Sequence, residues 1–140
     1  MKRITLSLGS NLGNRQQHLA AARNLIEAEV GKICRQSSIL ETESWGFSSF
    51  KFLNQIIVIE STHPPLEMLE KLQGIEKQLG RETKSRHTVS GSRYVDRIID
   101  IDILLYEGVE MQSEQLTIPH PRMHERDFIK LHLQELDLEL

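Results

Sequence analysis

Residues 97–106 read Arg-Ile-Ile-Asp-Ile-Asp-Ile-Leu-Leu-Tyr, an apolar run that carries two aspartates separated by one residue. The run predicts a β-strand, in which successive side chains alternate between the two faces of a sheet. Asp100 and Asp102 would then project to the same face, with their Cα atoms about 6.5 Å apart. Two bare carboxylates at that spacing repel by roughly 2.5 kcal/mol at an effective dielectric of about 20. A divalent cation bound between the two carboxylates replaces this repulsion with attraction. Because oxygen-only ligation favours magnesium over zinc, we interpret the pair as a Mg-nucleotide site.

Length, charge and cysteine content limit the class of protein. A chain of 140 residues predicts one domain, residues 1–140. The single cysteine excludes an internal disulfide, and we expect Cys34 to be a small buried side chain. A net charge of −3 gives no general reason to expect nucleic-acid binding. No segment approaches membrane-spanning length and no signal-peptide pattern opens the chain, so we expect a cytoplasmic protein.

Hydrophobic spacing predicts a strand, a turn and a helix near the amino terminus. Residues 4–8 resemble a strand, and residues 9–14 form a turn rich in glycine and asparagine. A helix follows, with Asn14 as its N-cap. Its apolar residues recur at spacings of three and four; they are Leu19, Ala22, Leu25 and Ile26. The turn lacks the Gly-Lys-Ser/Thr ending of a phosphate-binding loop, so it is interpreted as a capped strand-to-helix connection.

The middle of the chain predicts a central strand followed by a second helix. Residues 52–60 are rich in β-branched side chains, which are typical of strands. Pro64 and Pro65 then open a helix, and Gly80 is well placed to end it. The apolar stripe predicted for this helix consists of Leu66, Leu69, Leu72, Ile75 and Leu79.

The carboxy-terminal part predicts a turn at residues 107–108, a short strand at 116–118 and a break at 119–121. A last helix would cover part of residues 123–136. Strands and helices follow one another along the chain, and we expect an antiparallel hairpin near the end. This order predicts the α+β class, and we expect a ferredoxin-like sandwich, a mostly antiparallel sheet with helices packed on it.

Residues 81–97 are basic and contain little that could build a core. Their basic side chains, against only Glu82 and Asp96, are Arg81, Lys84, Arg86, His87, Arg93 and Arg97. A segment this long without predicted structure is usually functional, so we expect a mobile basic loop over the site. Without a P-loop, the phosphates of a nucleotide would be held by magnesium on the aspartates and by arginines of this segment.

Three further positions are candidates for ligand binding. Asn54 lies among apolar neighbours on its predicted strand, where a buried amide is costly without partners, and a ligand with hydrogen-bonding edges could satisfy it. Trp45 and Phe47 lie in a loop of small polar residues and are candidates for stacking on a flat heterocycle. His120 lies between two prolines, which exclude a helix there, and no histidine pattern indicates a zinc site.

Four blocks of this sequence resemble the motifs of one family, the 6-hydroxymethyl-7,8-dihydropterin pyrophosphokinases of folate biosynthesis. Residues 9–13, Gly-Ser-Asn-Leu-Gly, resemble the amino-terminal motif, and Phe52-Leu53-Asn54 resembles the pterin strand. Residues 97–105 resemble the metal-binding signature. Residues 116–123, followed by Arg126 and Phe128, resemble the carboxy-terminal signature. The blocks fall in order across nearly all of the 140 residues.

The resemblance implies transfer of the terminal diphosphate of ATP to the pterin hydroxymethyl group, with release of AMP and with two Mg²⁺ ions as cofactors. The implied catalytic residues are Arg81, Arg97, Asp100 and Asp102, of which the aspartates bind the metal. The implied pterin-binding residues are Thr42, Trp45, Phe52, Asn54 and Phe128. The implied ATP-binding residues are Gln73, Glu76, Lys84, His120 and Arg126. We expect a monomer with no nucleic-acid or membrane partner.

The chain departs from the family pattern in two segments, residues 81–97 and residues 42–46. Tyr94 stands where a tryptophan is frequent and Lys84 where a second arginine is frequent, while residues 42–46 lack a proline-containing run. Two other functions stay open on the residues alone. One is a magnesium-dependent transferase that acts on another acceptor, and the other is a non-catalytic ferredoxin-like module that binds a small effector or a partner.

Overall fold

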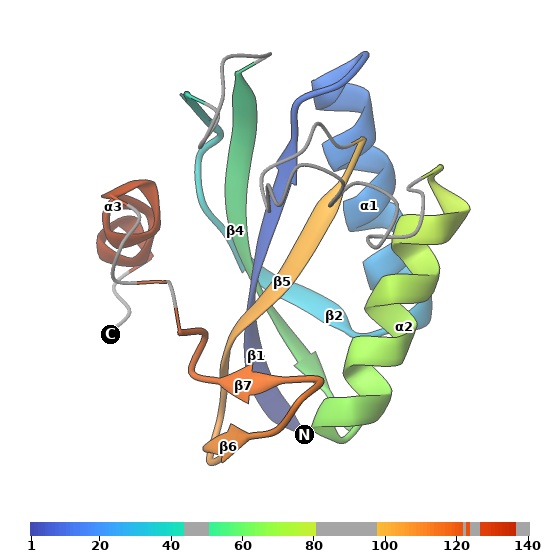
Figure 1. Cartoon of the computed structure of the whole chain (residues 1–140), viewed down its shortest axis with the longest axis vertical. Helices are drawn as coiled ribbons and strands as arrows, with labels where there is room; N and C mark the ends of the chain where they lie inside the picture. Colours follow the sequence, from blue (N-terminus) through green and yellow to red (C-terminus); the bar gives the residue numbers. More distant parts are fainter. Residues whose placement is uncertain (44–50, 81–97, 122, 124–126, 137–140) are drawn as a thin grey trace.

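A computed structural model describes residues 1–43, 51–80, 98–121, 123 and 127–136 of the chain (Figure 1). Its elements in chain order are β1 (Lys2–Ser10), α1 (Arg15–Glu29), β2 (Lys32–Gln36), β3 (Leu40–Thr42), β4 (Phe52–Ser61), α2 (Pro65–Gln78), β5 (Asp100–Tyr106), β6 (Met111–Gln112), β7 (Thr117–Ile118) and α3 (Asp127–Glu135). Within these residues, none of the helices combines the length and the apolar character needed to cross a membrane.

The main sheet has five strands in the order β2-β4-β1-β5, with β3 also paired to β4. Each strand pairing within the described residues is antiparallel. Without the short β3, the chain order is β1-α1-β2-β4-α2-β5, the split β-α-β arrangement of ferredoxin-like folds. The predicted α+β class and ferredoxin-like sandwich are therefore confirmed.

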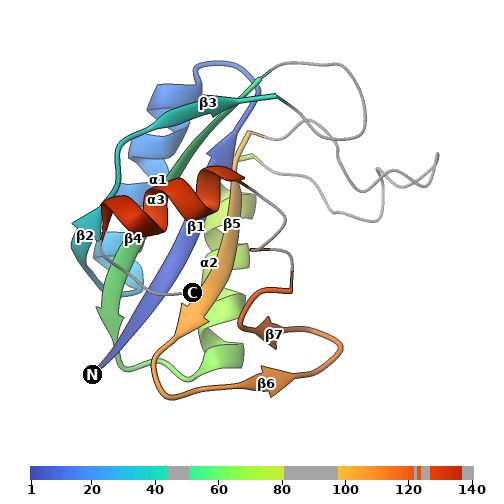
Figure 2. The ribbon, with the colours of Figure 1, turned by 90° about the vertical axis from the view of Figure 1, so that its left-hand side faces the viewer.

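Helices cover both faces of the sheet. Figures 1 and 2 show α1 and α2 on one face and α3 on the other. The larger hydrophobic core lies between the sheet and the first two helices, and a smaller one joins Ile56 and Leu104 to α3. Side chains alternate along a strand, so Asn54 and Asp102, each two residues from a member of the smaller core, share the face of α3.

The first helix is capped as predicted. The side chain of Asn14 accepts a hydrogen bond of 3.1 Å from the backbone N–H of Gln17. Three of the four predicted apolar residues are fully buried, and Leu25 is partly buried against the same core. Gly9 and Ser10, predicted in the turn, instead extend β1, so the connection to the helix is shorter than predicted.

The predicted stripe of α2 is wrong at its first position. Leu66 is 46% exposed, and Met68 takes its place in the core with Leu72 and Ile75. Leu66 precedes Met68 by two residues, which is about 200° around an α-helix, so the two side chains cannot face the same side. The predicted end is confirmed, because Gly80 follows the helix with a φ of +107°.

The expectation of a buried Cys34 is also wrong. The thiol is exposed on β2, a strand at the edge of the sheet whose residues are mostly exposed. Its Sγ donates a hydrogen bond of 3.3 Å to the carbonyl oxygen of Val58. An apolar side chain on an edge strand finds less cover than one on a central strand, and the sequence alone did not identify β2 as an edge.

The turn predicted at residues 107–108 is confirmed. Gly108 has a φ of +72°, and the N–H of Val109 donates to the carbonyl of Tyr106 at 3.0 Å. The paired strands that follow are β6 and β7, which close around residues 113–116. The chain then returns to β5, where the backbone N–H of His120 donates to the carbonyl of Leu104 at 2.9 Å.

The last helix lies within the predicted range and is fastened to the chain between β2 and β3. The backbone N–H and hydroxyl of Ser38 each donate a 2.8 Å hydrogen bond to the carboxylate of Glu135. These bonds stabilise the ionised form and lower the pKa of Glu135. Arg35 donates to the carbonyl oxygen of Leu136. All three contacts hold the carboxy-terminal end of α3.

His132 is the buried polar residue of α3. It is 2% exposed, and neither ring nitrogen has a hydrogen-bond partner among the described residues. Burial lowers the pKa of His132 below its usual 6.5, and the charge of nearby Glu135 opposes this shift. The folded chain therefore carries a neutral imidazole whose nitrogens have lost their hydrogen bonds to water, which costs free energy.

We predict that His132→Leu raises the free energy of unfolding at pH 7 by about 1 kcal/mol, because it removes two unsatisfied nitrogens and keeps an apolar filler. The unfolded chain binds the His132 proton more tightly than the folded chain does. Wild-type stability should therefore fall as pH drops through 6.5 toward the lowered folded pKa, and the variant should lose this part of the slope.

Urea unfolding at several pH values between 5 and 8 measures both effects. The exposed Lys130→Ala on the same helix is the control and should keep the wild-type slope. A variant that is less stable than wild type at pH 7, or that keeps the full slope below pH 6.5, would contradict this account of His132.

Candidate active site

One row of residues crosses the sheet where β1 ends and β4 and β5 begin. Gly9 of β1 lies opposite Asn54 of β4 on one side and opposite Asp100 of β5 on the other. Directly opposed residues of antiparallel strands share a face, and neighbouring strands lie about 4.8 Å apart. Asn54 and Asp100 are therefore about 10 Å apart on the face of α3, with no side chain between them.

The aspartate pair has the predicted alternation. Asp100 and Asp102 are half-buried, while Ile101 and Ile103 on the opposite face are 5% and 3% exposed. Asp102 lies opposite Ser7 of β1, one row further from the strand end than Asp100. Both carboxylates thus project from one face of a strand whose other face is fixed in the main core.

Gly9 allows the side chains of Asn54 and Phe52 to approach the backbone of β1 closely. A Cβ built at this position would lie 3.3 Å from the Oδ1 atom of Asn54 and 3.5 Å from the Cδ1 atom of Phe52. The first of these contacts is tighter than side chains normally accept, so a larger residue would have to displace the amide. The φ of Gly9 does not lie in the left-handed region, so a larger residue here would meet crowding by neighbouring side chains and no backbone strain.

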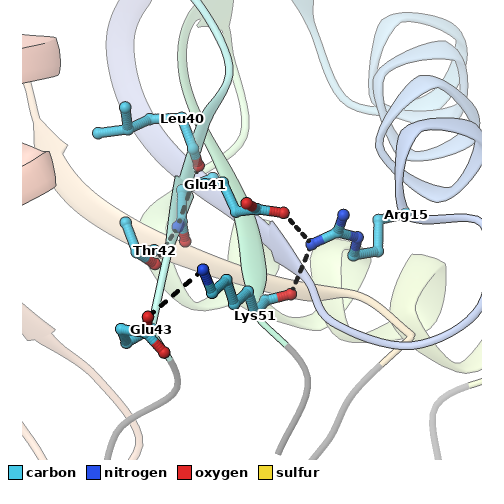
Figure 3. A network of polar contacts seen from close by, with 7 residues as sticks. Arg15, Leu40, Glu41, Thr42, Glu43 and Lys51 are labelled. Atoms are coloured by element: carbon cyan, nitrogen blue, oxygen red, sulfur yellow. Dashed lines mark hydrogen bonds and ion pairs between the residues drawn. The ribbon is translucent and has the colours of Figure 1, made fainter.

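The buried amide nitrogen of Asn54 finds its hydrogen-bond partners within the protein. Asn54 is 5% exposed, and its Nδ2 donates to the Thr42 hydroxyl at 2.6 Å and to the Leu40 carbonyl at 3.4 Å. Both acceptors belong to β3 (Figure 3). The amide nitrogen is thus satisfied by the protein, and the oxygen Oδ1 lies close to Gly9.

Ion pairs hold β3 in place beside the start of β4. One guanidinium nitrogen of Arg15 donates to the carbonyl of Lys51 at 2.8 Å and lies 2.9 Å from a carboxylate oxygen of Glu41 (Figure 3). The ammonium of Lys51 lies 3.5 Å from Glu43. Such exposed pairs contribute little to stability. They join the start of α1 to the two strands that position Thr42 and Asn54.

The two aromatic candidates lie on the same face of the sheet as the aspartates. Phe52 opens β4, two residues before Asn54, and is half-buried. Phe128 lies in the first turn of α3 and is also half-buried. Its ring meets the ring of His132 edge to face, with centroids 6.3 Å apart and an interplanar angle of 72°. Both phenyl rings therefore keep surface available for a flat ligand.

Two candidates for the nucleotide side flank β5. Glu76 of α2 is 5% exposed and accepts a 2.7 Å hydrogen bond from the backbone N–H of Ile101, the residue between the aspartates. His120 is joined to β5 through the carbonyl of Leu104. Gln73 is exposed on α2, three residues before Glu76. The sequence did not indicate the contact between Glu76 and β5, although Glu76 follows Leu72 by four residues and so lies on the apolar stripe.

Gly80 and Ile98, the described residues on either side of segment 81–97, lie close together. A Cβ at Gly80 would lie 3.2 Å from the Cδ1 atom of Ile98, so the residue before the segment touches the residue after it. Ile98 precedes Asp100 by two residues. Five predicted site residues lie outside the described part of the chain; they are Trp45, Arg81, Lys84, Arg97 and Arg126.

The donor set suits magnesium bound together with a nucleotide. The described residues contain no group of three or more histidine, cysteine, aspartate or glutamate side chains that could enclose a metal. Magnesium in nucleotide sites is usually held by one or two carboxylates, water and phosphate oxygens. Asp100 and Asp102 meet this requirement, whereas a structural zinc site would need more protein ligands.

Comparisons with known proteins agree with this geometry. A family model described as 7,8-dihydro-6-hydroxymethylpterin-pyrophosphokinase (HPPK) matches residues 5–138. A Porphyromonas gingivalis protein named 2-amino-4-hydroxy-6-hydroxymethyldihydropteridine pyrophosphokinase is 43% identical over 135 residues, which cover 95% of this chain and 89% of the relative. A Bacillus subtilis protein of the same name is 37% identical over 133 residues, 94% of this chain and 75% of the relative.

Solved structures share the fold. The chain matches a crystal structure of HPPK-DHPS in complex with substrates with a TM-score of 0.71 at 18% identity, over 96% of this chain and 40% of that chain. It matches wild-type HPPK-DHPS from Plasmodium falciparum with a TM-score of 0.70 at 17% identity, over 96% and 41% of the two chains. This chain thus spans about two-fifths of those longer proteins and shares the ferredoxin-like arrangement with them.

The contact between Thr42 and Asn54 gives a stability prediction. Thr42→Val keeps the shape of the side chain and removes the acceptor of the 2.6 Å bond, so it should lower the free energy of unfolding by about 1–2 kcal/mol. Thr42→Ser keeps the hydroxyl and is the matched control. Urea unfolding measures both, and equal stabilities of the valine and serine variants would show that the hydroxyl does not hold the amide.

Proposed function

The chain belongs to the 7,8-dihydro-6-hydroxymethylpterin-pyrophosphokinase family, and we propose that it performs the family reaction on the face of the sheet that carries Asn54 and Asp100. It is a pyrophosphokinase of folate biosynthesis, which transfers diphosphate from ATP to the hydroxymethyl group of 6-hydroxymethyl-7,8-dihydropterin and gives AMP and the pterin diphosphate.

The row Asn54-Gly9-Asp100 is the observation that carries the proposal. It combines an amide oxygen, a position without a side chain and a carboxylate within about 10 Å on one face. An acceptor ring over Gly9 would have its polar edge at Asn54 and its reactive substituent toward Asp100. The same central strand thereby sets the distance between the acceptor and the donor phosphates.

On the pterin side, Phe52 and Phe128 would stack on the ring from its two faces. Offset stacking contributes about 0.5–1.5 kcal/mol per ring pair beyond burial of the rings. Asn54 would accept a hydrogen bond from a ring N–H through Oδ1, because its nitrogen is already used by Thr42 and Leu40. The backbone near Thr42 and Trp45 would complete the contacts to the polar edge.

On the nucleotide side, Asp100 and Asp102 would hold two Mg²⁺ ions through carboxylate oxygens. Bound magnesium would neutralise the phosphates and favour in-line displacement at the β-phosphorus. Arg81 directly follows Gly80 and Arg97 directly precedes Ile98, and these two neighbours touch. That contact supports a role for both arginines on the transferred diphosphate, with positive charge where negative charge develops.

The other nucleotide contacts would come from Gln73, Glu76, Lys84, His120 and Arg126. The attachment of His120 to β5 supports a place near the α-phosphate and ribose. We also propose that the enzyme acts as a cytoplasmic monomer. Closure of the site around both substrates would exclude water that otherwise hydrolyses ATP.

The metal role predicts the behaviour of Asp102→Ala. The substitution removes a metal ligand and no core group, so turnover should fall at least about 100-fold while the melting temperature stays close to wild type. The assay follows AMP release that depends on both ATP and the pterin. The exposed Glu110→Ala is the control and should keep full activity. Turnover of Asp102→Ala within a few-fold of wild type would exclude the proposed role.

The stacking role predicts the behaviour of Phe128→Ala. Loss of the ring should raise the KM for the pterin about tenfold or more and leave the KM for ATP nearly unchanged, because of the two substrates only the pterin would contact the ring. Leu131→Ala, at a position 55% exposed on the same helix, is the control. A Phe128→Ala variant in which only the affinity for ATP falls would contradict the stacking of Phe128 on the pterin. AMP release with another acceptor in place of the pterin would indicate a different transferase.

A further inference from the structure

Glu76 occupies an unusual position for a carboxylate. It lies on the buried side of α2, four residues after Leu72 and eight after Met68, both of which are 1% exposed or less. Leucine would suit this stripe, because an ionised carboxylate is costly to bury unless hydrogen bonds satisfy it. One of its oxygens accepts a 2.7 Å hydrogen bond from the N–H of Ile101. The helix thus directs a buried carboxyl group at the backbone of β5.

The N–H of Ile101 that donates to Glu76 belongs to β5, the last strand in the order of the sheet. Within the described chain, β5 pairs along one edge only, with β1. In an antiparallel ladder, backbone N–H groups point alternately toward the neighbouring strand and away from it. The N–H of Ile101 points away from β1 toward α2, and Figure 1 shows α2 beside this strand. Without Glu76, this outward donor would be buried with no partner in the sheet.

Ile101 is the residue between Asp100 and Asp102. Asp100 and Asp102 are paired with Gly9 and Ser7 of β1. Ile101, between them, is held by Glu76 on the edge of β5 that faces away from β1. The three attachments together define the pleat at this point. The pleat sets the separation and direction of the two carboxylates, since both leave the strand from the same face.

We propose that Glu76 is a positioning residue that sets the geometry of Asp100 and Asp102 through the N–H of Ile101, and thereby the affinity of the enzyme-nucleotide complex for its divalent cation. This inference rests on the proposed metal role of the two aspartates. It gives Glu76 a task that is separate from contact with the nucleotide itself. Groups that hold metal-binding side chains in place typically change metal affinity or activity about 10–100-fold when they are removed.

Four variants separate positioning from stability. Glu76→Leu removes the acceptor and keeps the volume, and Glu76→Gln keeps an oxygen of the same reach. Glu70→Gln, at an exposed position on the same helix, makes the same chemical change away from β5. Leu72→Ala destabilises the same helix from within the core and leaves the contact to Ile101 unchanged.

The main measurement is the dissociation constant of Mn²⁺ from the complex of each protein with a non-hydrolysable ATP analogue. We expect Glu76→Leu to raise it about 10–100-fold. Glu76→Gln, Glu70→Gln and Leu72→Ala should stay near the wild-type value, although Leu72→Ala melts at a lower temperature. The Ile101 amide proton should exchange faster in Glu76→Leu than in Leu72→Ala variants of comparable stability. The KM for the pterin should not change.

Two results would overturn the inference and keep the proposed function. One is a Glu76→Leu variant with wild-type Mn²⁺ affinity but a changed preference between ATP and GTP, which would indicate direct contact with the base. The other is an equal loss of Mn²⁺ affinity in Glu76→Leu and Leu72→Ala, which would reduce Glu76 to a stability role. A wild-type complex that binds Mn²⁺ no better than Asp102→Ala would instead overturn the metal site and the inference with it.

Discussion

The pairing of β1 with a strand on each side is the constraint on which the site depends. Gly9 is held opposite both Asn54 and Asp100, so one backbone position sets the distance between the two ends of the proposed reaction. The main core on the far face prevents the strands from sliding, because a shift by one residue would turn every isoleucine to the wrong face. Packing far from the ligands therefore determines how accurately the ligands meet.

The alternation along residues 97–106 predicted the shared face of the aspartates, since a strand has a period of two and the isoleucines had to be buried. The cap at Asn14 and the end at Gly80 were predictable because both depend on neighbours within a few residues. Leu66 and Cys34 were predicted wrongly, since their burial depends on where a helix begins and on which strand lies at the edge. The spacing of apolar residues along the sequence determines neither property.

Long-range contacts were the least predictable part of the candidate site. The sequence marked Asn54 as a residue in need of a partner, but it could not identify the hydroxyl of Thr42, which arrives from a strand twelve residues earlier. It placed Glu76 near the nucleotide through a family resemblance, whereas the hydrogen bond to Ile101 spans 25 residues and follows only from the packing of α2 on β5. The family resemblance assigned the roles of Asn54 and Glu76, and the structure identified the residues that they contact.

The bare backbone at Gly9 has a consequence for inhibition. A Cβ introduced at this position would press on the amide oxygen of Asn54 and lie against the ring of Phe52. A compound that exploits the close approach of these two side chains would therefore be hard to evade by substitution at Gly9, because the same substitution would disturb two of the proposed pterin contacts at once.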